Sequence, residues 1–340
     1  MHDELLEVDD LRTYFFLDEG AVKALDGVSF TVRRGRTLGI VGESGCGKSV
    51  AALSILRLLG HKGKIVSGSV KLYGDEFGPL GHVDLARLNP TGPKMKAIRG
   101  KDIAIIFQEP MTSFCPVYSI GNQIIEAILL HQHVRPEQAR SRAVDMLRKV
   151  GIPQPELRID EYPYQLSGGM RQRAMIAMAL CCHPKLLIAD EPTTALDVTI
   201  QAQILDLMRS LQREFGMAIM LITHNLGVVA EMAEDVIVMY LGRIVERGPV
   251  DELFHNPLHP YTRALMKSIP RMGSGAKGRL ESIKGAVPDG YNIPHGCSFH
   301  PRCPEYRKGQ CNMRVPVLAE MSPGHQVACL LFGEVSADGC

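Results

Sequence analysis

A glycine-rich segment near the start of the chain carries the clearest chemical signal. It reads Gly42, Glu43, Ser44, Gly45, Cys46, Gly47, Lys48 and Ser49, followed by Val50. This order fits the pattern G-x-x-x-x-G-K-[ST], in which glycines let backbone N–H groups surround a phosphate. Lys48 would reach the β- and γ-phosphates, and the Ser49 hydroxyl would bind Mg²⁺. A chance glycine turn is the alternative, and it is disfavoured because a strand pattern precedes the segment and a helix pattern follows it.

Two adjacent carboxylates stand later in the chain, directly after an apolar run. Asp190 and Glu191 follow residues 185–189, Lys-Leu-Leu-Ile-Ala. Asp190 is placed to hold the Mg²⁺ shell, and Glu191 is placed to polarise an attacking water. Alone, the same residues would equally fit a buried strand that leads into an acidic helix start. Beside the phosphate-binding pattern of residues 42–49, they favour hydrolysis of a nucleoside triphosphate.

The elements that must position these residues alternate between strands and helices. Strands are expected at residues 28–32, 37–41, 67–73, 103–107, 186–189 and 218–223. Helices are expected at residues 50–59, 120–150, 169–182, 198–215 and 259–270. This alternation predicts an α/β domain with a mainly parallel sheet.

Composition narrows the class of protein. The 340 residues include 38 Lys plus Arg and 37 Asp plus Glu, so there is no basic excess of the kind that nucleic-acid binders show. The chain begins with polar and acidic residues, unlike a secretory signal, and no apolar run approaches the roughly 20 residues of a membrane span. We therefore expect a soluble, cytosolic protein that reaches a membrane only through a partner.

Residues 166–173 decide between the classes of nucleoside triphosphatase. They read Leu-Ser-Gly-Gly-Met-Arg-Gln-Arg and resemble the signature sequence of ATP-binding-cassette (ABC) proteins. Other family motifs occur in order: Gln108 after a strand, Ala195-Leu196-Asp197 after the acidic strand, and His224 after the next strand. The resemblance covers roughly residues 5–255. It implies an α/β fold, the P-loop ABC-type nucleotide-binding domain, with a RecA-like core, an antiparallel β subdomain and an α-helical subdomain at about residues 109–165.

The resemblance also implies a dimer. Two such domains close head to tail around two ATP molecules, so that residues 42–49 of one face Ser167, Gly168 and Gly169 of the other. Ser167 is a suitable N-cap for the helix that follows. The N–H groups at the start of that helix would complete the ring of donors around the γ-phosphate. Asp197 would lie at the dimer seam. The second ATPase subunit is either identical or homologous.

Further roles come from the same resemblance. Gln108 would contact Mg²⁺ and the attacking water, Glu191 would be the catalytic base, and His224 would hold the γ-phosphate and orient Glu191. Mg²⁺ would be bound by Ser49, Gln108 and Asp190. An aromatic residue near the start of the domain would stack on adenine, with Phe16 favoured over Tyr14, although core packing is an equal alternative for each.

Two segments indicate the branch of the family. Residues 190–205 and 256–265 resemble the ATPase subunits of dipeptide and oligopeptide importers. Such a subunit would lie on the cytoplasmic face of the inner membrane against two permease subunits, with an extracytoplasmic binding protein delivering the solute. Residues 114–116, Phe-Cys-Pro, depart from the Leu-Asn-Pro of that subfamily close to the expected permease contact.

The end of the chain calls for a separate account. We expect the nucleotide-binding domain at residues 1–258 and an irregular Cys-rich extension at 259–340, with a linker at 271–278. Five of the nine cysteines lie there, and four of them form the candidate cluster: Cys297, Cys303, Cys311 and Cys329. Four thiolates can hold a [4Fe–4S] cluster or Zn²⁺, and importer subunits with such a tail resemble cluster binders. The prediction is a [4Fe–4S] site, with Zn²⁺ or no metal as alternatives and Cys340 as an exposed thiol.

Two rival functions remain. A soluble ABC ATPase acting on nucleic acid or ribosomes would show two cassettes, a coiled-coil insertion or a basic surface, and the sequence shows none of them. An importer ATPase for nickel or oligosaccharides stays possible, since the solute is selected mostly by other subunits.

Overall fold

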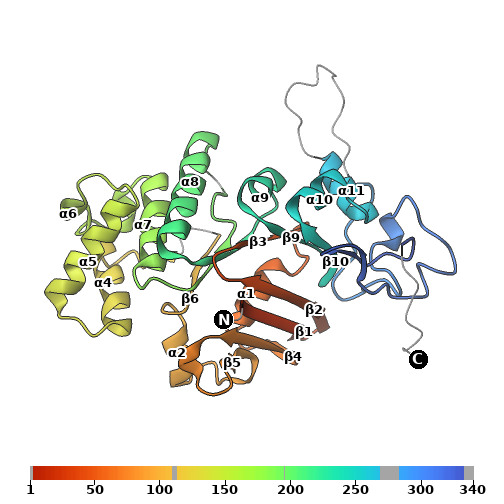
Figure 1. Cartoon of the computed structure of the whole chain (residues 1–340), viewed down its shortest axis with the longest axis horizontal. Coiled ribbons are helices and arrows are strands. Elements are labelled where there is room, and N and C mark those ends of the chain that lie inside the picture. The colour runs from red at the N-terminus through yellow and green to blue at the C-terminus, as the bar shows by residue number, and fades with distance from the viewer. Residues whose placement is uncertain (1–2, 109–112, 195, 269–282, 333–340) are drawn as a thin grey trace.

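An eight-stranded sheet runs through the middle of the computed structural model, which describes residues 3–108, 113–194, 196–268 and 283–332 (Figure 1). In sheet order its strands are β11 (Ala319–Ser322), β12 (His325–Val327), β10 (Arg243–Pro249), β9 (Asp235–Tyr240), β3 (Thr37–Val41), β8 (Ala218–Ile222), β7 (Leu186–Asp190) and β6 (Ile103–Ile106). The strands from β9 to β6 are parallel, and β10, β12 and β11 are added antiparallel. The predicted α/β class is therefore confirmed.

The central parallel strands are short and are buried from end to end. All five residues of β3, β7 and β8 are buried, which is usual where helices or a second layer cover both faces of a sheet. β3 lies between β8 and β9, so the loop that follows β3 emerges from the middle of the sheet, with only β8 between it and the end of β7. This placement brings the predicted phosphate-binding loop and the pair Asp190–Glu191 to the same edge of the sheet.

A second, antiparallel sheet covers one side of this core. Its order is β2 (Gly20–Arg33), β1 (Glu4–Leu17), β4 (Gly63–Tyr73) and β5 (His82–Asp84). The helix α1 (Lys48–Ile55) shares one hydrophobic cluster with both sheets, through Ala51, Ala52 and Ile55. The short helix α2 (Pro93–Ile98) contributes Met95 and Ile98 to the same cluster.

The helical part lies at the end of the molecule opposite the C-terminal tail (Figure 1). It contains α4 (Ile120–His131), α5 (Pro136–Lys149), α6 (Pro155–Arg158) and α7 (Gly168–Leu180), while α8 (Val198–Phe215) covers the sheet. The helical pattern expected at residues 120–150 is present as two helices, because Pro136 starts a new helix after the extended residues Gln132 and Arg135. The helix expected at residues 198–215 has these bounds in the structure.

The described part of the C-terminal tail does not form a separate irregular domain. The hairpin of β11 and β12 pairs with β10 and continues the main sheet. Phe299 is buried against Tyr240 and Tyr261, in a cluster that also includes residues of α9 (Leu226–Met232), α10 (Val250–His255) and α11 (Pro260–Lys267). The expected irregular Cys-rich extension therefore shares a hydrophobic cluster with the nucleotide-binding fold.

Some predictions fall outside the described residues. These are the linker at 271–278, the end of the helix expected at 259–270, Ala195 and Cys340. Among the helices that the structure does describe, none is long and apolar enough to cross a membrane.

Candidate active site

The glycine-rich segment forms a tight loop between β3 and α1. Gly47 has a φ of +102°, and a Cβ there would lie 2.4 Å from the carbonyl oxygen of Ala24. A Cβ on Gly42 would lie 2.3 Å from the carbonyl oxygen of Met239. Both positions therefore require glycine, and the loop is folded tightly against β2 and β9. The predicted strand–loop–helix arrangement is present.

Lys48 opens α1 and turns back over the loop. Its side chain is buried, and its Nζ donates to the carbonyl oxygens of Gly42 at 2.7 Å and Glu43 at 3.0 Å. The ammonium group is thus held over the loop, where its positive charge could attract an anionic oxygen.

Glu191 is the centre of a hydrogen-bonded group at the end of β7. Its Oε1 lies 3.0 Å from Nδ1 of His224, and its Oε2 accepts from Gln108 Nε2 at 3.1 Å and Thr194 Oγ1 at 2.9 Å. Its φ of +50° turns the chain sharply at this point, and its N–H donates to Ile222 at the end of β8. Burial favours the neutral acid, but the contacts with His224 and Thr194 outweigh it and hold the pKa of Glu191 below its usual value.

Asp190 lies deeper than Glu191. Burial raises the pKa of its carboxyl group, and a hydrogen bond with Ser49 opposes only part of this rise. The buried Oδ1 atom has no hydrogen-bond partner among the described residues. A buried carboxylate oxygen with nothing to neutralise it is costly, and an oxygen-coordinated cation would satisfy it. Together, the Ser49 hydroxyl and the Asp190 carboxylate fit Mg²⁺.

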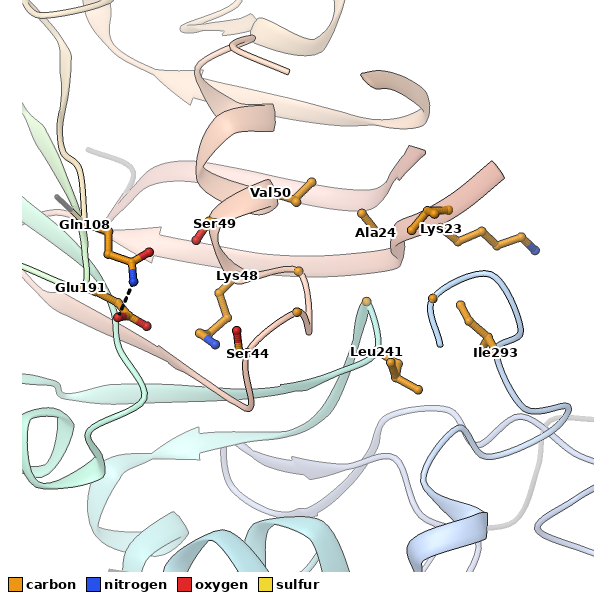
Figure 2. Close-up of a pocket in the computed structure, with 15 residues that line it drawn as sticks. Lys23, Ala24, Ser44, Lys48, Ser49, Val50, Gln108, Glu191, Leu241 and Ile293 are labelled. Carbon is orange, nitrogen blue, oxygen red and sulfur yellow. Dashed lines mark hydrogen bonds between the residues drawn. The ribbon is translucent and has the colours of Figure 1, made fainter. Parts of the chain in front are cut away.

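A pocket lies beside Lys48, Ser49 and Glu191 (Figure 2). One end is lined by predicted residues: Ser44, Gly45, Gly47, Lys48, Ser49, Val50, Gln108 and Glu191. The other end is lined by residues that the sequence analysis missed: Val22, Lys23, Ala24, Leu241, Gly242, Gly290 and Ile293. The second set comes from three separate parts of the chain, and no local pattern in the sequence marks any of them as part of a site.

The predicted aromatic contact is not at the pocket. Phe16 is 48% exposed and carries Lys64 over its ring, and the Tyr14 hydroxyl donates to Asp26 at 3.1 Å. Neither side chain lines the pocket, where Val22 and Ala24 of the same hairpin stand instead.

The signature segment lies outside the pocket as well. Ser167 is exposed and caps α7, its Oγ accepting from the N–H of Met170 at 3.4 Å, and Gly168 is exposed beside it. Asp197 is likewise exposed and caps α8 by accepting from the N–H of Ile200 at 2.9 Å. Gly169 packs next to Ile200, so the two helix starts are neighbours. They present a surface without contacting the pocket of their own chain.

Comparison with known proteins agrees with this geometry. Residues 25–194 match the model of the ABC transporter family, and the chain is 49% identical over 335 residues to the oligopeptide transport ATP-binding protein AppD of Bacillus subtilis strain 168, with 98% of each chain covered. This chain belongs to the ABC transporter family. It is also 47% identical over 325 residues to the dipeptide transport ATP-binding protein DppD of Escherichia coli K12, with 96% of each chain covered.

A solved ABC cassette shares the fold. The dimeric post-hydrolysis structure of the ATP-binding cassette MJ0796, bound to ADP and Pi, superposes with a TM-score of 0.62 at 25% identity and covers 72% of this chain and 99% of that one. Residues 245–311 match a separate model, the C-terminal region of oligopeptide/dipeptide transporters. As an ABC transporter ATP-binding subunit, the chain is an ATPase, as the resemblance of its motifs implied.

The metal site predicted in the tail of this ABC subunit is not supported. Among the described residues, no group of three or more His, Cys, Asp or Glu side chains is arranged to hold a metal ion. Burial, aided by the neighbouring Cys303 and Cys311, raises the pKa of Cys297 and Cys329 to about 11. The described tail pairs with β10 and packs against Tyr240 and Tyr261, and neither a [4Fe–4S] cluster nor Zn²⁺ is supported there.

Proposed function

We propose that this ATPase drives the import of dipeptides or oligopeptides across the inner membrane. The observation that carries the proposal is the match of residues 245–311 to the C-terminal region of oligopeptide/dipeptide transporters, on a chain whose pocket has the residues for ATP hydrolysis. Two near-full-length relatives are named for oligopeptide and dipeptide transport. The solute would be delivered by an extracytoplasmic binding protein, and the subunit would work at the cytoplasmic face.

In this proposal the triphosphate of ATP lies in the loop of residues 42–49. Lys48 and the loop N–H groups bind the β- and γ-phosphates, because they are the positive end of the pocket. The adenosine extends toward the other end, where Val22, Leu241 and Ile293 supply apolar surface. We therefore expect adenine to contact these residues and not Phe16 or Tyr14.

Ser49, Gln108 and Asp190 would hold Mg²⁺, which would neutralise charge on the phosphate oxygens. The unpartnered, buried Oδ1 atom of Asp190 supports this set of ligands. Gln108 reaches the same region from the end of β6, where its amide already donates to Glu191.

Glu191 is proposed as the catalytic base. Its lowered pKa keeps it ionised at neutral pH, so it can accept a proton from the attacking water. His224 contacts one carboxylate oxygen and Thr194 the other, which fixes the direction in which the carboxylate points. His224 would also bind the γ-phosphate from the outer side of the pocket, since its side chain is largely exposed.

The site would be completed by a second ATPase subunit. Ser167, Gly168 and Gly169 begin α7 on an exposed surface, next to the exposed Asp197 that begins α8. A helix N-terminus on a free surface suits the γ-phosphate held by another subunit. The related MJ0796 cassette is a dimer, which supports a head-to-tail pair here.

The permease subunits are proposed to dock on α4. A groove there is lined by Asn122, Ile125, Glu126, Leu129 and Leu130, and Leu130 is 73% exposed. Leu129 and Leu130 are both exposed there and form an apolar surface that a partner subunit could cover. Leu130→Asp should prevent assembly with the permease while ATP binding by the isolated subunit is retained.

Uptake by cells tests the proposal. A strain that lacks this subunit is complemented with the wild type or with Glu191→Gln, and uptake of labelled dipeptide, tetrapeptide, nickel and a trisaccharide is measured. We expect peptide uptake to return only with the wild type. If the wild type restores nickel or trisaccharide uptake and not peptide uptake, the peptide proposal is wrong and the importer for that solute takes its place.

A further inference from the structure

The second residue of the phosphate loop turns away from the pocket and into the tail. Both carboxylate oxygens of Glu43 accept from the guanidinium of Arg302, at 2.7 Å and 3.0 Å. Such a two-pronged contact fixes both distance and direction and is among the stronger polar contacts in proteins. It joins residues that are 259 positions apart in the chain.

Arg302 is itself held rigidly. Its side chain is only 4% exposed and lies over the rings of Tyr240 and Phe299. Its Nε also donates to the carbonyl oxygen of Lys284 at 3.3 Å. A guanidinium with this many partners cannot move without breaking several contacts, so it is a fixed point for Glu43.

A second contact holds the backbone of the same loop residue. The N–H of Glu43 donates to the hydroxyl of Tyr261 at 2.8 Å, and Tyr261 is fully buried in α11. Tyr261 and Arg302 thus hold the main chain and the side chain of Glu43 from two directions. Both belong to the part of the chain that follows residue 258.

The charge of Glu43 makes this arrangement matter for nucleotide binding. A carboxylate within the loop would repel the phosphates of ATP, and its repulsion is strong where water is excluded. The guanidinium neutralises the carboxylate and also keeps it pointed away from the pocket. A glycine-rich loop is otherwise flexible, and binding to a flexible loop costs ordering free energy.

We propose that Arg302 and Tyr261 are positioning residues that hold the phosphate loop, through Glu43, in the conformation that binds nucleotide. This inference rests on the proposed placement of ATP in the pocket. It makes the tail part of the nucleotide site, beyond any role in transporter assembly. A merely structural contact would affect the stability of the fold and leave nucleotide affinity unchanged.

A double-mutant cycle on the full-length chain tests this. Nucleotide affinity is measured by titration with a fluorescent ADP analogue for the wild type, Arg302→Met, Glu43→Gln and the double variant, alongside thermal unfolding without nucleotide. Arg302→Met should weaken binding about tenfold or more, because it leaves Glu43 charged and unpaired. The double variant should bind better than Arg302→Met, because the repelling charge is gone.

Two further variants distinguish an effect on the phosphate loop from the general effect of losing an ion pair or of misfolding. Arg140→Met removes an exposed two-pronged pair with Asp160 in the helical part and should leave affinity within twofold. Tyr261→Phe removes a single hydroxyl, so it tests the loop contact even if Arg302→Met does not fold, and it should weaken binding several-fold.

The inference is overturned if Arg302→Met or Tyr261→Phe lowers the melting temperature while affinity stays within twofold of wild type. Lys48→Ala reports separately on the proposed function, because binding that survives this change would mean that the nucleotide is not in the pocket at all.

Discussion

His224 and Glu191 lie at the ends of neighbouring strands, with Nδ1 of the histidine 3.0 Å from Oε1 of the glutamate. β7 and β8 are parallel and adjacent, so the residues that follow them reach the same edge of the sheet. The contact needs no movement of either strand. It leaves Glu191 oriented before any substrate arrives.

Glu191→Gln is the first prediction from this contact. Hydrolysis should fall about 100-fold or more, the usual effect of removing a general base, while ATP binding is kept or tightened. Phosphate release and binding of a fluorescent ATP analogue measure the two quantities. His224→Ala should give a similar but smaller loss. A Glu191→Gln protein that hydrolyses ATP within threefold of the parental rate would remove this residue from the mechanism.

Ile293 gives a prediction for the other end of the pocket. Ile293→Ala removes apolar surface and should weaken ATP binding about tenfold, as expected when the nucleotide covers one aliphatic side chain. Phe16→Ala is the control and should change affinity less than twofold, since Phe16 does not line the pocket. The reverse result would restore the original prediction that Phe16 stacks on adenine.

His259 should make the stability of the protein depend on pH. Burial, aided by the charge of Arg263, lowers the pKa of this histidine from 6.5 to about 3, and its Nδ1 accepts from the N–H of Tyr261. The unfolded chain binds the proton more tightly, so the contribution to stability is full above pH 6.5 and is lost as the pH falls toward 3.

Urea unfolding at pH 7.5 and pH 5 measures this loss, which should be about 2 kcal/mol from His259 alone. His259→Asn keeps an acceptor at the start of α11 but does not titrate, so its stability should fall by about 2 kcal/mol less over the same range. Equal losses in both proteins would show that His259 is not the group responsible.

Glu246 is a buried carboxylate that connects β10 to the tail. It accepts from the N–H groups of Leu258 and His259 at 2.8 Å and 2.9 Å, and it lies 2.8 Å from Nε2 of His325. Glu246→Leu should destabilise the fold by about 3 kcal/mol or more, because several buried donors lose their acceptor. Denaturant unfolding checks this, with the exposed Glu137→Leu as a control expected to stay within about 0.5 kcal/mol.

Local patterns were enough to predict the parts of the site that adjoin strands. Residues 42–49 and the pair Asp190–Glu191 are contiguous in sequence, and their chemistry follows from the order of residue types. The burial of whole strands such as β3 and β7 is equally local, since both strands consist mainly of apolar residues.

The contacts that were missed all depend on packing between distant segments. Ile293 lines the pocket and Arg302 binds Glu43 only because the tail folds back along β10. Nothing in the residues around either one indicates that path. The unsupported metal site in the tail has the same cause. The composition of the tail alone does not reveal the hydrophobic cluster that it shares with other segments of the chain.

Tyr261 and Arg302, which hold the phosphate loop, are also translated late. The loop is complete once Ser49 has been translated, yet Tyr261 and Arg302 follow Glu43 by 218 and 259 residues. The strands on both sides of β3 likewise come after residue 217. A nascent chain therefore carries the entire nucleotide motif long before it has the parts that shape it, and a prematurely terminated product keeps the motif without its supports.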